Sequence, residues 1–393
     1  MQVVLLHYAL VFFPALGSQN PQFIHFRWEL HGVDTPLTFL FDGTTAVYLF
    51  FIMSGVVLTH AFGNRHRAVP WLITRRVIRL GLPMAATLLL TAILFSAFPD
   101  MRLVAFKLLR VSWLGTSIPT VSAASIGHQI AIEGLLTGYR DQGFLPHWAA
   151  TILGLHSMAQ ARNPPLWTLH VEFVGSLLVL ALVRLRASVS RATYLAICLI
   201  LLLCFLASPL GLFIMGHWAA PRLGQAGKGV WQRALAVACL ILGIVMSTRT
   251  IVVVPPVLLS LLRSPPIGPS IEPNDVQLML GAVLLFAGLH QLPILRRALA
   301  TPVMRWLGKI SFSLYLTHFP VLFTVTAAIY VVIAAYLPFG ASLAVGGLTG
   351  IAVSLAIAAL FERWIDRPAI ALSRMVGIPG SRLTVPAQAS TAA

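Results

Sequence analysis

Residues 341–361 read ASLAVGGLTGIAVSLAIAALF, a run of twenty-one residues without a charged side chain, closed by Glu362 and Arg363. About 20 apolar residues are enough for a helix to cross the hydrocarbon core of a bilayer. The same composition extends over the whole chain of 393 residues, of which 58% are hydrophobic and only 10% are charged. In soluble domains about a quarter of residues are charged. The sequence therefore predicts an integral membrane protein.

Ten apolar runs follow one another along the chain. They lie near residues 1–17, 38–62, 80–98, 166–183, 193–208, 210–221, 234–254, 277–293, 310–336 and 341–361. Because backbone polar groups must be paired in hydrocarbon, such runs form helices. We predict an all-α, polytopic helical bundle with about ten transmembrane helices, in which residues 1–375 form one membrane domain and residues 376–393 a disordered cytoplasmic tail. The first run is short for a crossing, so we expect its helix to extend upstream of Met1.

Basic residues are distributed unevenly between the connecting segments. The segments after the second, fourth, sixth, eighth and tenth runs hold 19 of the 27 Lys and Arg residues, and the other segments hold 8. Positively charged loops stay in the cytoplasm. We therefore expect a multi-pass protein of the plasma (inner) membrane with both termini in the cytoplasm. The formal charge of +16 has the same origin, and we expect no nucleic-acid partner.

The segment 63–79 is a strongly basic connection that ends with Arg75, Arg76 and Arg79. Spacings of three and four residues bring these side chains together on one turn of a helix. Guanidinium groups bind phosphate in a bidentate manner, so we predict a phosphate-binding cluster. The alternative is a topology signal that contacts the anionic head groups of membrane lipids.

Ionisable residues inside the apolar runs are few, and such residues are costly at mid-bilayer and usually functional. His7 lies in the first run and Glu172 in the fourth. Tyr315 and His318 lie in the ninth run, where they share one helix face with Ser311. A single buried histidine is more often a hydrogen-bonded core residue than a catalyst. Two histidines and a glutamate, together with the arginine cluster, favour a catalytic site.

The connection from about residue 99 to 165 is long for a loop. Its polar and aromatic residues include Trp113, His128, Glu133, Tyr139, Arg140, Asp141, His147, Trp148 and His156. This mixture suits the binding of a polar molecule at the outer face, and a re-entrant loop with interfacial aromatic residues explains it equally well. Since the chain contains no HExxH motif and no carboxylate cluster, we predict no metal site.

Five short motifs occur in order along the chain. They are FFIMSG at 50–55, RVIR at 76–79, PLWTLHVE at 165–172, LGKISFSLYLTH at 307–318 and FER at 361–363. Each motif is weak alone, but their order and spacing resemble the acyltransferase-3 family of integral-membrane O-acyltransferases over nearly the whole chain. The resemblance implies transfer of an acyl group, expected to be acetyl, from cytoplasmic acyl-CoA to a hydroxyl of a sugar, glycolipid, envelope polysaccharide or secondary metabolite.

The chain departs from the family's pattern at three positions. Tyr48 stands where the family often has Asp, two residues before the paired phenylalanines, and Phe173 stands where a second Glu often follows the one that matches Glu172. The family's first span carries an Arg eleven residues before its His, which falls before Met1 if His7 is that His. These departures concern the substrate subclass more than the fold.

Acyl transfer to a hydroxyl needs a general base, because a sugar hydroxyl is a poor nucleophile, and histidine titrates in the suitable range. His7 is the first candidate for this base and His318 the second. Glu172 is the candidate carboxylate that orients the imidazole, like the acid of a catalytic triad. Tyr315, Trp167 or a backbone N–H would donate a hydrogen bond to the thioester oxygen as it gains charge.

The expected donor substrate is acyl-CoA, with acetyl-CoA the expected form, and its phosphates would bind Arg75, Arg76 and Arg79. The expected acceptor is a hydroxylated carbohydrate or a lipid-linked molecule. The alternative function is a proton-coupled secondary transporter, which would also use buried His and Glu residues as a proton relay. Against it, the sequence lacks the internal repeats common in transporters. A non-catalytic membrane scaffold would leave the buried His and Glu residues without a role.

Overall fold

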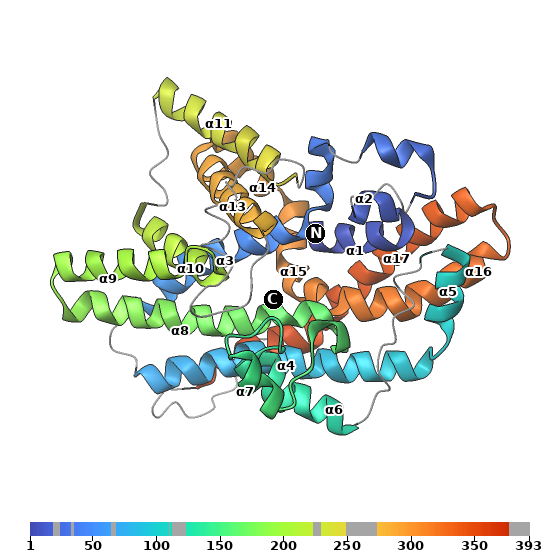
Figure 1. Ribbon diagram of the computed structural model, residues 1–393, viewed down its shortest axis with the longest axis horizontal. Coiled ribbons are helices and arrows are strands. Elements are labelled where there is room, and N and C mark those ends of the chain that lie inside the picture. The colour runs from blue at the N-terminus through green and yellow to red at the C-terminus, as the bar shows by residue number, and fades with distance from the viewer. Residues whose placement is uncertain are drawn as a thin grey trace, which may run out of the picture.

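The computed structural model describes residues 1–18, 24–32, 35–63, 68–109, 111, 123–222, 229–248 and 273–376. Within these ranges the secondary structure is helical, without a β-strand, so the predicted all-α class is confirmed. The helices α4 (Val69–Ala97) and α8 (Trp167–Ser188) lie side by side along the longest axis of the molecule (Figure 1). The predicted tail lies outside the described residues from 377 onward.

Five helical segments are long and apolar enough to cross a bilayer. They are α3 (Gly43–Phe62), α4, the segment Pro164–Ser188 that contains α8, the segment Pro302–Ala334 that contains α15 (Pro302–Val321) and α16 (Ala327–Ala334), and the segment Phe339–Met375 that contains α17 (Phe339–Phe361) and α18 (Arg367–Met375). The helices α13 (Pro273–Gln291) and α14 (Pro293–Leu299) meet at a bend of 95° and would add a sixth span as a broken pair.

The predicted number of about ten spans is not confirmed, because four of the apolar runs form shorter helices. These are α1 (Gln2–Phe12), α9 (Arg191–Cys204), α10 (Pro209–Ala219) and α11 (Val230–Met246), with 11 to 17 residues each. A crossing needs about 20 residues. The helix α9 ends at Cys204 and α10 begins at Pro209, a residue suited to the first turn of a helix, so the two adjacent predicted spans are a pair of short helices.

The helix α4 begins at Val69, eleven residues before the apolar run that starts near residue 80. Pro70 suits the first turn of a helix, because the missing N–H has no partner there in any case. The helix therefore carries Arg75, Arg76 and Arg79, which the sequence placed in a connection before the span. Charged side chains on a spanning helix need partners inside the bundle, and α4 has them, as shown below.

The long connection between α4 and α8 is largely helical where the structure describes it. It contains α5 (Met101–Leu109), α6 (Ala123–His128), the π-helix η5 (Gln129–Thr137) and α7 (His147–Ile152). The π-helix packs against both α4 and α8, and Leu135 joins Met84 and Leu169 in one apolar cluster. This segment is therefore part of the bundle rather than a plain loop.

The N-terminal helix lies at the centre of the molecule, where α1 packs against α3, α15 and α17 (Figure 1). One apolar cluster joins α1 to α15, α16 and α17. A second joins α3, α8, α10 and α13, and a third joins α4, η5, α8 and α15. Tyr315 packs against both the second and the third cluster, so the candidate site lies where the parts of the core meet.

Candidate active site

His7 on α1 and His318 on α15 are in direct contact. His318 Nε2 lies 3.1 Å from His7 Nδ1, and the ring centroids are 5.0 Å apart. Phe319 places its ring edge-on to the His7 ring, with centroids 5.7 Å apart. The structure thus brings together the two residues predicted as alternative bases, although 311 positions separate them in the chain.

The hydrogen-bond partners assign the proton on each ring. His318 Nδ1 faces two carbonyl oxygens, Leu314 O at 3.0 Å and Tyr315 O at 2.8 Å, so in the neutral ring Nδ1 carries the proton and Nε2 accepts. His7 Nδ1 must then be a donor, shared between His318 Nε2 and Val3 O at 2.8 Å. The remaining lone pair of His7 is on Nε2, to which no described residue makes a hydrogen bond.

The two histidines differ in access. His318 is completely buried, and both of its ring nitrogens have partners. His7 is only partly buried, and its Nε2 is the ring nitrogen left to accept a proton. The geometry therefore favours His7 as the base and His318 as the residue that orients it.

Glu172 has a different partner from the one predicted. Its Oε1 accepts from Arg76 Nη2 at 2.5 Å, and the two side chains are 6% and 17% exposed. Ser54 of the FFIMSG motif lies beside the Glu172 side chain. The predicted contact between Glu172 and His7 is not present in the structure. His318, rather than a carboxylate, occupies the orienting position at His7 Nδ1.

The arginines of α4 are divided between two carboxylates. Arg76 pairs with Glu172, whereas Arg79 Nη1 pairs with Asp366 Oδ1 at 2.5 Å. The Arg79 guanidinium also lies over the Phe312 ring, 4.8 Å from its centroid. Arg75 is partly exposed on the same helix. Arg76 and Arg79 therefore each have a carboxylate partner in the structure, and the binding of phosphate by the three arginines stays a prediction.

Tyr315 connects α15 to the start of α8. Its hydroxyl donates to Pro165 O at 2.5 Å and accepts from Thr168 Oγ1 at 2.9 Å. The single hydroxyl proton is thus engaged by a backbone carbonyl, and Tyr315 does not offer it to a substrate in this arrangement. Asn163 strengthens the same contact, since its buried amide donates to Leu316 O at 2.8 Å.

A small cavity of about 200 Å³ lies beside this contact, between α1, α3, α8 and α15. Most of its lining is apolar, including Val3, Val4, Val47 and Phe50, with Tyr315 at one side. Pockets for drug-sized molecules measure about 300–1,000 Å³. The cavity therefore suits a short acyl group and is too small for a whole coenzyme.

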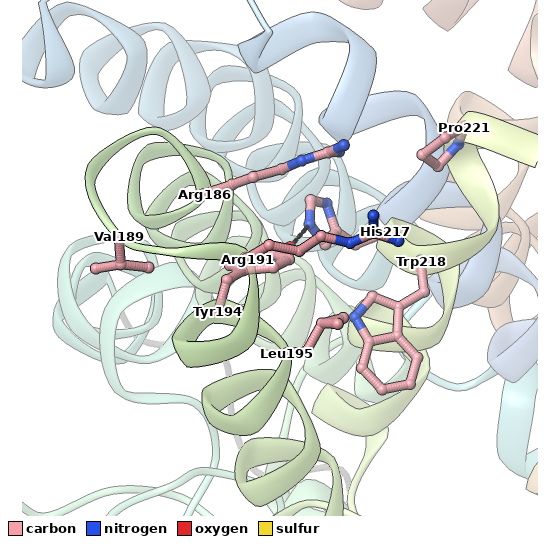
Figure 2. A pocket seen from close by; sticks show the side chains of 8 residues that line it. All are labelled: Arg186, Val189, Arg191, Tyr194, Leu195, His217, Trp218 and Pro221. Atoms are coloured by element: carbon pink, nitrogen blue, oxygen red, sulfur yellow. Dashed lines mark hydrogen bonds between the residues drawn. The ribbon is translucent and has the colours of Figure 1, made fainter.

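A larger pocket of about 660 Å³ lies between α8, α9 and α10. Figure 2 shows the side chains of Arg186 and Arg191 extending in the same direction, toward His217. His217 is held firmly, with Nε2 2.5 Å from Tyr194 Oη and Nδ1 2.7 Å from Thr59 Oγ1. In the described part of the chain neither arginine forms an ion pair. The pocket therefore presents two cationic groups to an anionic ligand.

A family model described as an acyltransferase domain matches residues 1–363. The chain belongs to the acyltransferase-3 family. This confirms the resemblance seen in the five motifs and makes the protein a membrane acyltransferase. The acyltransferase-3 match covers both histidines, Glu172 and the α4 arginines, and it ends before Asp366. No curated protein and no solved structure matches the chain.

Sequence reasoning missed several residues of this acyltransferase site. Asp366 lies four positions after Glu362, on the same helical stripe as the FER motif, and that spacing is the signal that could have found it. Ser54 lies inside a motif that was recognised, but its partner Glu172 could not be read from the sequence. Arg186 and Arg191 were read only as topology signals, because the fold alone brings them beside His217.

Proposed function

We propose that this acyltransferase moves an acyl group, with acetyl as the expected case, from cytoplasmic acyl-CoA to a hydroxyl of a sugar, glycolipid, envelope polysaccharide or secondary metabolite. The observation that carries the proposal is the His7–His318 pair, which leaves the lone pair on His7 Nε2 without a hydrogen-bond partner among the described residues. A base of this kind is what transfer to a hydroxyl requires.

The proposed reaction begins when His7 Nε2 takes the proton of the acceptor hydroxyl as its oxygen attacks the thioester carbonyl. The tetrahedral intermediate collapses, the carbon–sulfur bond breaks, and the thiolate leaves. His7 then returns its proton to the sulfur, so the base is regenerated. While His7 is an imidazolium, His318 Nε2 accepts from its Nδ1–H and keeps the ring oriented, a role that the carboxylate fills in a catalytic triad.

The acyl group of the donor would occupy the 200 Å³ cavity beside Tyr315. The phosphates of coenzyme A lie far from its thioester, so the phosphate site must be some distance from His7. The pocket at Arg186 and Arg191 meets this requirement. Arg186 lies 18 residues beyond Thr168, which lines the acyl cavity, on the same helix α8, and this corresponds to about 27 Å along a helix.

Two arginine groups therefore compete as the phosphate site of the donor. Arg75, Arg76 and Arg79 remain candidates from the sequence, but Arg76 and Arg79 are already paired with carboxylates. Arg186 and Arg191 have no ion-pair partner among the described residues. We propose the second group as the primary phosphate site, with the first holding the bundle together close to the reacting groups.

Steady-state kinetics of purified protein with varied acyl-CoA separate the two groups. We expect Arg186→Gln and Arg191→Gln to raise the KM for acyl-CoA by about tenfold or more, because a hydrogen bond to a charged group contributes about 1.5–3 kcal/mol. Arg297→Gln, on α14, is the matched control. If the KM for acyl-CoA changes only in Arg76→Gln and Arg79→Gln, the phosphates of the donor bind the arginines of α4 instead. A KM unchanged in all four variants would refute both sites.

A proton-coupled secondary transporter is the alternative that the sequence left open. It predicts uptake of a solute driven by a proton gradient and no acyl transfer by the purified protein. Hydrolysis or transfer of acyl-CoA by wild-type protein, absent from a His7→Ala variant, would favour the acyltransferase. The family match supports the acyltransferase rather than the transporter.

A further inference from the structure

Three side chains outside the candidate active site converge on one point beside α4 and α8. His128 ends α6, Glu133 lies in the π-helix η5, and His156 lies in the segment after α7. Glu133 Oε1 is 3.3 Å from His128 Nδ1 and 2.8 Å from His156 Nδ1. All three potential ligand atoms lie within 4.8 Å of one another.

The local backbone creates this arrangement. A π-helix pairs residues five positions apart, so it sets Glu133 beside His128 on one side of the turn. His156 is brought in from the other direction, with its backbone N–H donating to Glu133 Oε1 at 2.6 Å and its carbonyl accepting from Arg140 N at 2.9 Å. Asp141 Oδ1 accepts from Met158 N at 2.8 Å and holds the following turn.

The negative charge of Glu133 is unfavourable in its buried position unless a positive charge lies nearby. The Glu133 side chain is 0% exposed, and the two imidazoles are 27% and 28% exposed. Glu133 Oε2 has no hydrogen-bond partner, and His128 Nδ1 approaches Oε1 without the geometry of a hydrogen bond. A buried carboxylate with an unpartnered oxygen is unfavourable unless a cation or a donor satisfies it.

We propose that His128, Glu133 and His156 bind a divalent transition-metal ion, with zinc as the ion that fits best. Two imidazoles and a carboxylate form a common ligand set for zinc, with bonds of about 2.0–2.1 Å. A tetrahedron of such bonds places neighbouring ligand atoms about 3.3 Å apart. The distance from His128 to Glu133 already has this value, and the contact from His156 would lengthen by about 0.5 Å when the ion replaces the shared proton.

The ion would cross-link the end of α6, the π-helix η5 and the turn after α7 within the segment between α5 and α8. The segment is joined to α8 separately, through Leu135 O, which lies 3.0 Å from His170 Nδ1. Loss of the ion would therefore loosen this segment internally while His7 and His318 stay in place. The spacing 128, 133 and 156 matches no HExxH pattern, which is why the sequence predicted no metal site.

Metal analysis of the purified full-length protein, with its affinity tag removed, tests the proposal. We expect about one zinc ion per chain by elemental analysis, restored by ZnCl₂ after chelation, and a higher Tm with Zn²⁺ than after chelation. His156→Gln and Glu133→Gln should weaken zinc binding by at least about tenfold, since even the loss of an outer-shell partner costs about 10–100-fold. His147→Gln changes an exposed histidine of the same segment and should bind zinc as the wild type does.

A second measurement uses the wild-type protein, so its result does not depend on whether a variant folds. Co²⁺ added to the chelated wild-type protein should give the intense visible absorption of a four-coordinate site, and Zn²⁺ should abolish it. Absence of both stoichiometric zinc and this Co²⁺ spectrum in the wild type would overturn the proposal. Equal zinc binding by wild type and a folded His156→Gln variant would also overturn it.

Discussion

The proposed chemistry at the residue scale depends on one nitrogen, His7 Nε2. His318 is buried and donates from Nδ1 to carbonyls of its own helix, so its Nε2 can only accept from His7. The pair therefore holds His7 in the tautomer that a base needs. A neutral histidine orients the base without adding a negative charge, which separates this site from a triad with a carboxylate.

Removing the base should affect turnover far more than donor binding. We expect His7→Ala to lower kcat by at least about 100-fold, the lower end for general-base catalysis, with the KM for acyl-CoA changed little. His318→Ala should lower kcat less and leave protein levels near normal. His31→Ala, at an exposed histidine, should behave as the wild type, and full activity in His7→Ala would exclude His7 as the base.

A second prediction for single residues concerns the ion pair between Arg76 and Glu172. Removing one partner of a buried ion pair costs about 3–5 kcal/mol, because the other charge is left unpaired. We expect Arg76→Gln and Glu172→Gln each to lower the Tm in detergent, and the double variant to recover much of the loss.

The control for this prediction is Arg367, an exposed cation that pairs with Glu362, to which Lys309 is also close. The Arg367 side chain is 54% exposed, and exposed pairs contribute about 0–1 kcal/mol. Arg367→Gln should therefore change the Tm only slightly. A double variant of Arg76 and Glu172 that is as unstable as the sum of the single variants would argue against an interaction between them.

At the element scale, the helices α3 and α10 pack closely against each other. Gly55 and Gly216 face each other there, and a Cβ atom on either would collide with backbone atoms of the opposite helix. Small residues allow such contact between helices in membranes. This contact sets α10 against the same helix that presents Ser54 to Glu172 and Thr59 to His217.

Enlarging this interface should destabilise the bundle. We expect Gly216→Ala to cost about 1–3 kcal/mol, as overpacking does, and to lower the Tm measured in detergent. Gly308→Ala on α15 is the matched control, because a Cβ atom there meets no neighbour within 4 Å. That change should be neutral or stabilise by about 0.4–1 kcal/mol, and an equal loss in both variants would contradict the packing explanation.

Orientation is the question at the scale of the whole molecule. Arg374 lies at the C-terminal end of the segment Phe339–Met375, and Tyr336 precedes its N-terminal end and is 83% exposed. The distribution of basic residues predicts that Arg374 faces the cytoplasm. The two positions should then lie on opposite sides of the membrane.

Cysteine labelling in intact cells tests this orientation. In a background without Cys198, Cys204 and Cys239, a membrane-impermeant maleimide should label Tyr336→Cys directly and Arg374→Cys only after permeabilisation. Both positions are exposed, so a failure to react reports the side of the membrane rather than burial. Direct labelling of Arg374→Cys in intact cells would reverse the predicted topology.

Composition and motifs, read from the sequence by themselves, determined that the chain is an all-α membrane protein of the acyltransferase-3 family, and they named His7, His318, Glu172 and Tyr315 as candidate site residues. Apolar run length and local residue order carry that information directly. They did not determine the number of spans, because four of the apolar runs form helices of only 11 to 17 residues.

Partnerships were decided only by the tertiary structure. His7 meets His318, Arg79 meets Asp366, and Glu133 meets His156, across separations that no periodicity encodes. The physical reason is that a charge or a ring nitrogen in a low-dielectric interior pairs with whichever group the folded backbone places within about 3 Å. The sequence shows which polar and ionisable side chains are present, and the packing of the helices determines which of them contact one another.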